Sequence, residues 1–325
     1  MHRTRESKNL SDIHELLEFL DLDIAKAPYP VLFTPLFPFA VSLGFAQKIT
    51  KGDWFDPLLL QVIPREEELL DRAGFAEDAV GDLQSISAPG LLHKYSSRVL
   101  LMSTKRCAGN CRFCFRRSFT PHALSDEKEG FSDALRYIED HREITEVVLS
   151  GGEPLCLSDE ELNVFLDKIC FVDHVGTVRF HTRALVTMPS RFSDALLNIL
   201  DQVRKRRNCV FVFHVNHPRE LDQQSRIITD RLSQKGIMLF SQSVLLRDVN
   251  DSVDVLGELF ANLIDLGIVP YYLHQLDRVR GASHFEVSTQ RGLEIMEQLR
   301  ARLPGYAVPR YVREVAGEPN KTPLF

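Results

Sequence analysis

Short apolar runs alternate with amphipathic stretches along the chain from Arg98 onward. Runs rich in β-branched and aromatic residues, with the length of strands, occupy 98–103, 146–150, 177–181, 209–215, 237–245 and 269–275. Apolar residues recur at helical spacing in 126–140, 159–169, 190–205, 220–234, 253–266 and 289–303. Strands that alternate with helices in this way pair in parallel through right-handed crossovers. The pattern therefore predicts an α/β fold, a barrel or partial barrel of six strand-helix units.

The two ends of the chain lack this alternation. Residues 1–90 predict a mostly helical N-terminal layer interrupted by prolines, 91–303 contain the barrel, and 304–325 form a Gly- and Pro-rich tail. The most apolar stretch, 29–46, contains three prolines that remove backbone donors which a membrane helix needs. The N-terminus mixes both charge signs before any apolar run, unlike a secretory signal. We therefore expect a cytoplasmic protein with no membrane partner.

The composition is that of a globular protein with a sizeable core. The chain has 325 residues, of which 44% are hydrophobic, and 39 basic residues stand against 45 acidic ones, for a net charge of -6. This acidic balance argues against a nucleic-acid partner held by phosphate contacts. Three of the six cysteines crowd into eight residues, whereas Cys156, Cys170 and Cys209 are scattered. Such crowding is more typical of metal binding than of a disulfide framework.

The crowded cysteines are Cys107, Cys111 and Cys114, directly after the first predicted strand. With this spacing, one loop can wrap three thiolates around a single inorganic centre. A [4Fe-4S] cluster has four irons, so three protein thiolates leave one iron open to a small ligand. A zinc site and a set of buried thiols are the alternatives. A structural zinc usually takes four protein ligands, and no nearby His or fourth Cys supplies one, so the spacing favours the cluster.

The second predicted strand ends in Ser150, Gly151, Gly152 and Glu153, followed by a proline. The two glycines would let the backbone approach a ligand closely and leave amides free to pair with it, and Glu153 offers an acceptor. Alone, this sequence predicts only a strand-ending turn. Together with the preceding cysteine loop it resembles the radical S-adenosylmethionine (SAM) superfamily. The resemblance implies a [4Fe-4S] cluster whose open iron is chelated by the methionine part of SAM, with the turn holding the methionine amine.

Further segments resemble the lysine 2,3-aminomutase family within this superfamily. The similarity covers roughly residues 38–325, and the compact length is most similar to members that supply β-lysine for the modification of elongation factor P. The resemblance implies a partial (β/α)6 radical-SAM barrel whose C-terminal tail binds pyridoxal 5'-phosphate (PLP). It also implies conversion of (S)-α-lysine to (R)-β-lysine. The segments that carry it are 93–98, 114–117, 213–218, 272–277, 281–285, 305–309 and 314–323.

The resemblance also assigns cofactor-binding residues. Lys321 would hold PLP as a Schiff base, and Lys94 and Arg98 would neutralise the PLP phosphate. His214 and Gln242 match positions near SAM. From the residues alone, Lys321 is equally a solvated lysine near a frayed terminus, and the others are polar residues at strand ends. The run before Lys321 is also less glycine-rich than in the family.

Three residues match the substrate contacts of the family. Arg116 would grip the substrate carboxylate, a task that suits a planar guanidinium. Asp277 and Glu314 match two aspartates that recognise the ε-ammonium of lysine. Glu314 departs from the family because a glutamate reaches one methylene further. Without the resemblance, these are an ordinary surface arginine and two solvated carboxylates.

The sequence leaves two rivals. An aminomutase for another amino acid, such as glutamate or arginine, would dispense with the paired acids, and a non-catalytic iron-sulfur electron-transfer or binding protein would have no PLP. As partners we expect L-lysine, a cellular one-electron donor, and a functional link to elongation factor P and its lysyl-ligase-like modifying enzyme. The oligomeric state stays open, a homo-oligomer included.

Overall fold

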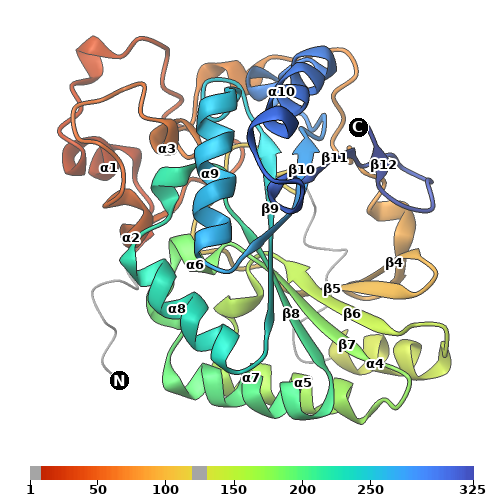
Figure 1. Cartoon of the computed structure of the whole chain (residues 1–325). Coiled ribbons are helices and arrows are strands. Elements are labelled where there is room, and N and C mark those ends of the chain that lie inside the picture. The colour runs from red at the N-terminus through yellow and green to blue at the C-terminus, as the bar shows by residue number, and fades with distance from the viewer. Residues whose placement is uncertain (1–8, 119–129) are drawn as a thin grey trace.

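One ten-stranded sheet forms the centre of the molecule (Figure 1). The computed structural model describes residues 9–118 and 130–325. The strands lie side by side in the order β12-β11-β10-β9-β8-β7-β6-β5-β4-β3, and each neighbouring pair from β5 to β11 is parallel. Every predicted strand is present with ends that differ by at most one residue. These strands are β5 (Arg98–Thr104), β6 (Glu146–Gly151), β7 (Thr177–Thr182), β8 (Asn208–His214), β9 (Met238–Leu245) and β10 (Val269–Gln275).

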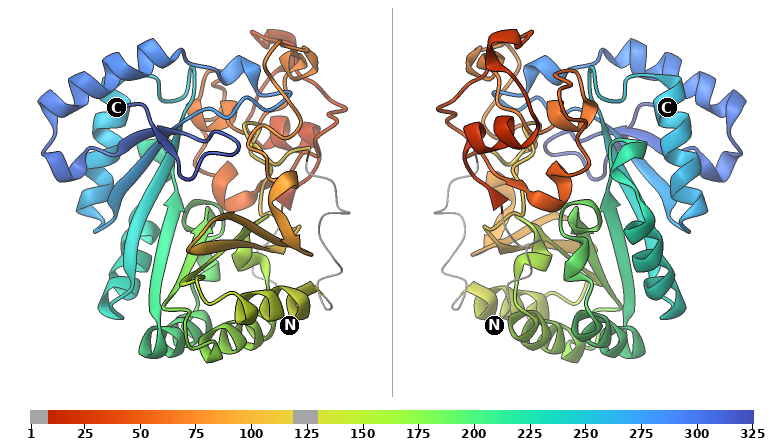
Figure 2. Two further views of the ribbon diagram at one scale, coloured as in Figure 1. Left: turned by 90° about the vertical axis from the view of Figure 1, so that its right-hand side faces the viewer. Right: turned by 90° about the vertical axis from the view of Figure 1, so that its left-hand side faces the viewer.

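The helices that connect these strands lie along the outer side of the curved sheet (Figure 2). The helices predicted at 190–205 and 220–234 begin later than predicted, because a 3-10 turn precedes each of them. Their N-caps are Ser193, which accepts from the Leu196 amide, and Asp222, which accepts from the Ser225 amide. The first predicted helix began at 126, and residues 126–129 lie outside the described part. The helices are α4 (Gly130–Asp140), α5 (Asp159–Phe171), α7 (Asp194–Arg206), α8 (Gln223–Gln234), α9 (Val253–Asp265) and α10 (Thr289–Arg302), with a short α6 (Ala184–Thr187) after β7. The parallel strands and their helices make the chain an α/β protein with a partial barrel.

The N-terminal region is less helical than the sequence predicted. Prolines break it into short pieces, and much of the chain between them is irregular. Its last part forms a hairpin that pairs antiparallel with β5, so a boundary at residue 90 falls inside one structural unit. The pieces are β1 (Asn9–Leu10), α1 (Ile13–Phe19), β2 (Val41–Ser42), α2 (Leu43–Ala46), α3 (Pro57–Leu60), β3 (Ile86–Ala88) and β4 (Leu91–Tyr95).

The C-terminal tail extends the sheet, which the sequence did not predict. β11 (Arg310–Arg313) pairs in parallel with β10, and β12 (Thr322–Pro323) folds back antiparallel on β11. The Leu324 amide also donates to the Tyr311 carbonyl at 2.9 Å. The tail is therefore held by backbone hydrogen bonds. All three sequence regions contribute to one hydrophobic core. Among the described residues, no helix is both long and apolar enough to cross a membrane.

Candidate active site

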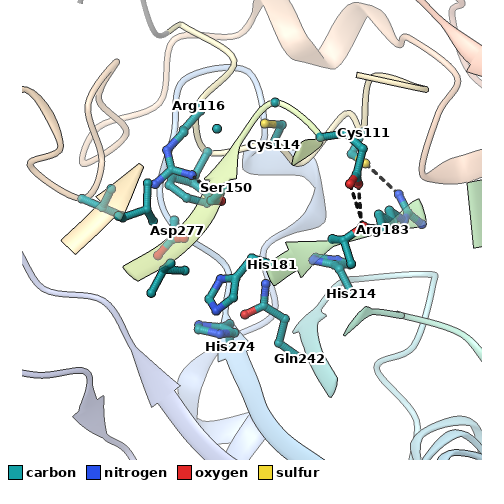
Figure 3. A pocket seen from close by; sticks show the side chains of 18 of the residues that line it. Cys111, Cys114, Arg116, Ser150, His181, Arg183, His214, Gln242, His274 and Asp277 are labelled. Atoms are coloured by element: carbon teal, nitrogen blue, oxygen red, sulfur yellow. Dashed lines mark hydrogen bonds between the residues drawn. The ribbon is translucent and has the colours of Figure 1, made fainter. Parts of the chain in front are cut away.

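A single cavity brings together every site residue predicted from the sequence. Its volume is about 310 Å³, within the range of small-molecule sites. It lies at the carboxyl ends of the parallel strands, where the connecting loops of such sheets gather functional side chains (Figure 3). The predicted residues in its lining are Lys94, Arg98, Cys107, Cys111, Cys114, Arg116, Ser150, Gly151, Gly152, Glu153, His214, Gln242, Asp277, Glu314 and Lys321.

Strand alternation explains which further side chains reach the cavity. Successive residues of a strand point to opposite faces, so one residue in two lines the interior. On β7, Val178 and Phe180 are buried away from the cavity, and Arg179 and His181 line it; Thr182, at the end of the strand, lines it too. β9 contributes Gln242 and Val244, and β10 contributes Tyr272 and His274, with Tyr271 as an exception to the alternation.

The cysteine loop follows β5 and is fastened to the N-terminal region. The amide of Asn110 donates to the Ala40 carbonyl at 2.8 Å. The fully buried guanidinium of Arg112 donates to both oxygens of Glu68, at 2.8 and 2.5 Å. The Asn110 and Arg112 contacts lie on either side of Cys111, and a buried ion pair is costly to break. Together they fix the loop around Cys111. The N-terminal region thus supports the cysteine loop.

The three thiols have the chemistry of ligands for a positive centre. Burial, and next the neighbouring Cys111 thiol, raises the pKa of Cys114 to about 11. A thiol with such a pKa becomes a thiolate at neutral pH only when a metal or cluster offsets this cost. Within the described residues, no three metal-ligating side chains gather around one point. In a [4Fe-4S] cluster each thiolate binds a different iron, so the three sulfurs need not converge on one ion.

The glycine turn after β6 has a role that differs from the sequence interpretation. The amides of Gly152 and Glu153 are not free for a ligand, because they donate to the carbonyls of Thr104 and Arg106, each at 2.8 Å. A Cβ on Gly152 would meet the Arg106 carbonyl, with its carbon at 3.0 Å and its oxygen closer still. Gly151 has a φ of +109°, which L side chains rarely adopt. The two glycines therefore allow close contact with the chain itself, Gly151 with the end of β5 and Gly152 with the start of the cysteine loop.

Glu153 is a buried acceptor for the chain itself. Its Oε1 accepts from the Thr182 hydroxyl at 2.6 Å and the Leu155 amide at 3.1 Å, and its Oε2 accepts from the Arg183 amide at 2.8 Å. The carboxylate thus joins β6 to the end of β7. Its assignment to SAM stays a prediction.

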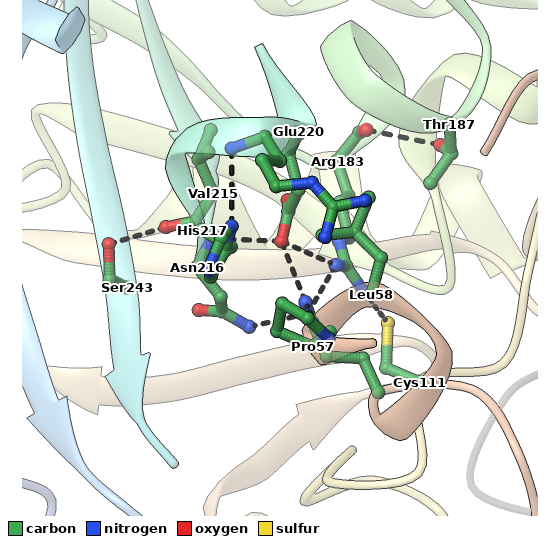
Figure 4. A network of polar contacts seen from close by, with 12 residues as sticks. Pro57, Leu58, Cys111, Arg183, Thr187, Val215, Asn216, His217, Glu220 and Ser243 are labelled. Atoms are coloured by element: carbon green, nitrogen blue, oxygen red, sulfur yellow. Dashed lines mark hydrogen bonds and ion pairs between the residues drawn. The ribbon is translucent and has the colours of Figure 1, made fainter. Parts of the chain in front are cut away.

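Arg183 connects this turn to the cysteine loop, although no motif drew attention to it (Figure 4). Its guanidinium donates to the Cys111 sulfur at 2.7 Å and to the Gln61 side chain at 2.6 Å, and it pairs with the buried Glu220 at 3.2 Å. Asn216 donates to the same Gln61 oxygen at 3.1 Å. The only sequence signal for Arg183 was its position one residue after β7, since functional residues often follow parallel strands.

The tail residues meet the hairpin residues across the cavity. Lys321 Nζ lies 2.6 Å from Glu314 Oε2, and the Tyr95 hydroxyl donates to Glu314 Oε1 at 2.6 Å. Burial raises the pKa of Glu314, but Lys321, Tyr95 and Lys94 outweigh it and lower the pKa overall. Lys321 is therefore in the cavity and not a solvated lysine at a frayed end. Of the two cations assigned to the PLP phosphate, Lys94 is already paired with Asp82, whereas Arg98 stacks on the Tyr95 ring at 4.4 Å.

Asp277 is the unpaired acceptor among the described residues of the cavity. Its carboxylate makes no hydrogen bond or ion pair with any residue of the described segments, and burial, opposed mainly by Lys321, raises its pKa to about 7. Arg116 also lines the cavity, with its Nε bonded to Asp82 Oδ2 at 2.7 Å. The cavity therefore offers both carboxylates and a guanidinium, which suits a zwitterionic amino acid with a cationic side chain.

Buried imidazoles complete the lining. In the described part of the chain, the Nε2 atoms of His181, His214 and His274 are buried without a hydrogen-bond partner. Burial lowers the pKa of each ring, for His214 to about 3, so all three are neutral at pH 7. Unpaired buried nitrogen atoms are costly unless a polar ligand meets them. The lining thus fits polar cofactors. The sequence did not predict His181 and His274 as site residues.

Comparison with known proteins identifies the family of the chain. The family model of the radical SAM superfamily matches residues 101–252, the part from β5 to the end of β9 and just beyond. The chain is a radical SAM enzyme, a class that uses a [4Fe-4S] cluster and SAM. It is 39% identical over 316 residues to an L-lysine 2,3-aminomutase of Escherichia coli (97% of this chain, 92% of the relative). It is 40% identical over 313 residues to that of Haemophilus influenzae (96% and 92%).

This similarity assigns the chain to a family. It belongs to the lysine 2,3-aminomutase family, whose members are isomerases. A solved radical SAM methyltransferase from Sphaerobacter thermophilus is 20% identical, covers 68% of each chain and has a TM-score of 0.48. The identity to the two L-lysine 2,3-aminomutases confirms the family predicted from the sequence motifs.

Proposed function

We propose that this enzyme is a PLP-dependent lysine 2,3-aminomutase that converts (S)-α-lysine to (R)-β-lysine. The observation that carries the proposal is Asp277, an unpaired carboxylate in the cavity near Glu314. Two neighbouring carboxylates repel each other and raise one pKa unless a cation lies between them. The ε-ammonium of lysine supplies that cation. A glutamate or apolar substrate would leave Asp277 uncompensated, whereas Glu314 already pairs with Lys321.

The chain's own residues bind and orient the substrate. Arg116 takes the α-carboxylate, and Asp277 and Glu314 take the ε-ammonium, so lysine is held through both of its charged groups. Lys321 anchors PLP, and Arg98 with Lys94 neutralises its phosphate. When bound, the cluster with SAM supplies a radical that removes hydrogen from C3 of lysine, and PLP supplies the conjugated ring that lets nitrogen move from C2 to C3. Holding the reactants in register and excluding water are the protein's contribution.

We further infer that the product serves the modification of elongation factor P. This step rests on the sequence resemblance to compact family members, with a lysyl-ligase-like enzyme as the consumer of β-lysine. A cytoplasmic location and a cellular one-electron donor follow from the same inference. Deletion of the gene should then leave elongation factor P without β-lysyl groups, which mass spectrometry of the purified factor would detect. Normal modification in the deletion strain would refute this link but not the aminomutase activity.

The activity is tested by anaerobic incubation of the reconstituted enzyme with lysine, SAM, PLP and a reductant. Chiral analysis of the products should find (R)-β-lysine, and a Cys114→Ala variant handled in parallel should give none. Lysine recovered unchanged from the wild type, together with cleaved SAM, would show a radical enzyme with another substrate. Glutamate and arginine in place of lysine provide that comparison.

A further inference from the structure

Asp82 lies in the cavity lining although no sequence motif includes it. Its side chain is 2% exposed, and it precedes the 3-10 turn Leu83–Ser85. Asp82 Oδ1 is 2.6 Å from Lys94 Nζ, and Asp82 Oδ2 accepts from Arg116 Nε at 2.7 Å. One buried carboxylate thus holds both the cation assigned to the substrate and a cation assigned to the PLP phosphate.

Asp82 is ionised, and the two cations keep it so. Burial raises its pKa, but Arg116 and Lys94 outweigh that effect and lower the pKa below its usual range. Breaking a buried ion pair by removing one partner leaves an uncompensated charge, which costs more than the pair itself contributes. The Asp82 amide is in turn held by Asp78 Oδ1 at 2.9 Å, so the backbone that carries the carboxylate is also fixed.

The contact with Asp82 decides which edge of Arg116 is available. A guanidinium can present two donors to a carboxylate from either of two edges, one of which includes Nε. Asp82 occupies Nε, and Nη1 lies 3.4 Å from the Ser150 hydroxyl. Within the described residues, Nη2 has no hydrogen-bond partner. The edge formed by Nη1 and Nη2 is therefore the one left for a ligand.

We propose that Asp82 is a positioning residue that orients Arg116, so that the Nη1–Nη2 edge selects substrates carrying an α-carboxylate. The inference rests on the proposed function, because Arg116 is assigned to the substrate carboxylate there. Asp82 touches neither substrate nor reacting atoms. It acts through the side chain of Arg116, and its loss should weaken recognition of the carboxylate more than recognition of the ε-ammonium.

The test compares two ligands that differ only in the carboxylate. Isothermal titration calorimetry, with the reconstituted enzyme and SAM but no reductant, measures the binding of lysine and of 1,5-diaminopentane, which is lysine without its carboxylate. The wild type should prefer lysine. Asp82→Asn should weaken lysine binding about tenfold and leave diaminopentane within about twofold, because one charge-assisted contact is affected. Asp82→Glu, which keeps the charge, should restore part of the preference.

Two further variants separate orientation from folding. Asp56 is a matched buried aspartate outside the cavity lining, and it pairs with Arg219 at 2.7 Å. Asp56→Asn should leave the ratio of the two affinities unchanged, whatever it does to the melting temperature. In an Arg116→Gln background, Asp82→Asn should change the ratio by less than about twofold, because the side chain it acts through is gone.

The outcomes are distinguishable. Equal weakening of lysine and diaminopentane binding in Asp82→Asn, or an undiminished lysine preference, would overturn the role of Asp82. If Asp82→Asn does not fold, an Asp82→Glu protein with no preference between the two ligands, or a further drop of the ratio in the double variant with Arg116→Gln, would also overturn it. A wild type that binds no lysine at all would instead overturn the proposed function.

Discussion

Lys321 and Glu314 form an ion pair of 2.6 Å, so the lysine assigned to PLP is held by a carboxylate assigned to the substrate. The pair joins the two ends of the turn between β11 and β12, and Gly317, with a φ of +84°, lies within it. Since the tail is fixed by β-pairing, Lys321 has a defined place in the cavity.

Replacing Lys321 by alanine should remove the covalent link to PLP and leave the iron-sulfur spectrum intact, because the two cofactors are bound by separate segments. Borohydride reduction followed by peptide mapping would find labelled Lys321 in the wild type only. Lys94→Ala is the matched control, since Lys94 lies within 3.8 Å of the same Glu314. A label that persists in Lys321→Ala and disappears in Lys94→Ala would move the anchor to Lys94.

Replacing Cys107, Cys111 or Cys114 by alanine should abolish SAM cleavage, because each thiolate holds one iron of the cluster. Cys156→Ala is the sharpest control. Cys156 is near enough to influence the pKa of Cys107, yet it lies outside the cavity lining. Iron and acid-labile sulfide content should stay close to wild type in Cys156→Ala. Similar iron loss in all four variants would mean that the cluster is located wrongly.

Much of the fold followed from the periodicity of apolar residues. The six parallel strands alternate with long amphipathic helices, and both patterns are visible without tertiary contacts. β11 and β12 are short and lie among prolines and glycines, so only their pairing with β10 makes them strands. The N-terminal region was predicted as mostly helical, but its prolines divide the described part into helices of at most seven residues. Several of its carbonyls accept hydrogen bonds from the cysteine loop.

The site likewise contains residues that the sequence predicts and residues that only the structure reveals. Cys107, Cys111 and Cys114 are close in sequence, and the motif is readable for that reason. Asp82 and Arg183 act through contacts with residues 34 and 72 positions away, and no local pattern announces such partners. The amides of the glycine turn were expected to meet a ligand. Their real partners are carbonyls of the loop before Cys107, which only the structure reveals.

Gly152→Ala should disturb the cysteine loop, because the new methyl group would collide with the backbone of Arg106. The backbone of Arg106 cannot avoid the methyl group by a rotamer change, as a side chain could. We therefore expect the unfolding free energy to fall by about 1 to 3 kcal/mol. Iron content should fall with it. Gly305→Ala is the matched control, since nothing lies within 4 Å of its Cβ position and its φ is ordinary. Denaturant melts measure the unfolding free energy of both variants. Equal unfolding free energies and equal iron contents would contradict a close contact between the glycine turn and the cysteine loop.

Glu314→Gln should weaken lysine binding by about 1 to 3 kcal/mol, the cost of one charge-assisted contact, and leave the cluster in place. Norleucine, which lacks the ε-ammonium, should lose far less affinity from the same substitution. Calorimetric titration of both ligands into wild type and variant measures the difference. Equal affinity of the wild type for lysine and norleucine would refute recognition of the ε-ammonium by the paired acids.

The pH dependence of lysine binding should report the ionisation of Asp277. Burial raises its pKa to about 7, so the group is neutral below that pH and anionic above it. Only the anion attracts the ε-ammonium. Lysine affinity should therefore decrease below pH 7, with a slope that approaches about tenfold per pH unit, and become constant above pH 7. Titrations from about pH 5.5 to about pH 8 cover this range, in which the ammonium of lysine stays charged.

Asp277→Asn is the control for this profile. The variant should bind lysine more weakly at pH 8 and lose the slope between pH 6 and pH 7, because the titrating carboxylate is gone. Norleucine binding should be nearly flat for the wild type over the same range. Burial lowers the pKa of His181, His214 and His274, for His214 to about 3, so these rings are not expected to account for a slope near pH 7. A slope that survives in Asp277→Asn would therefore assign it to another group and remove Asp277 from ammonium recognition.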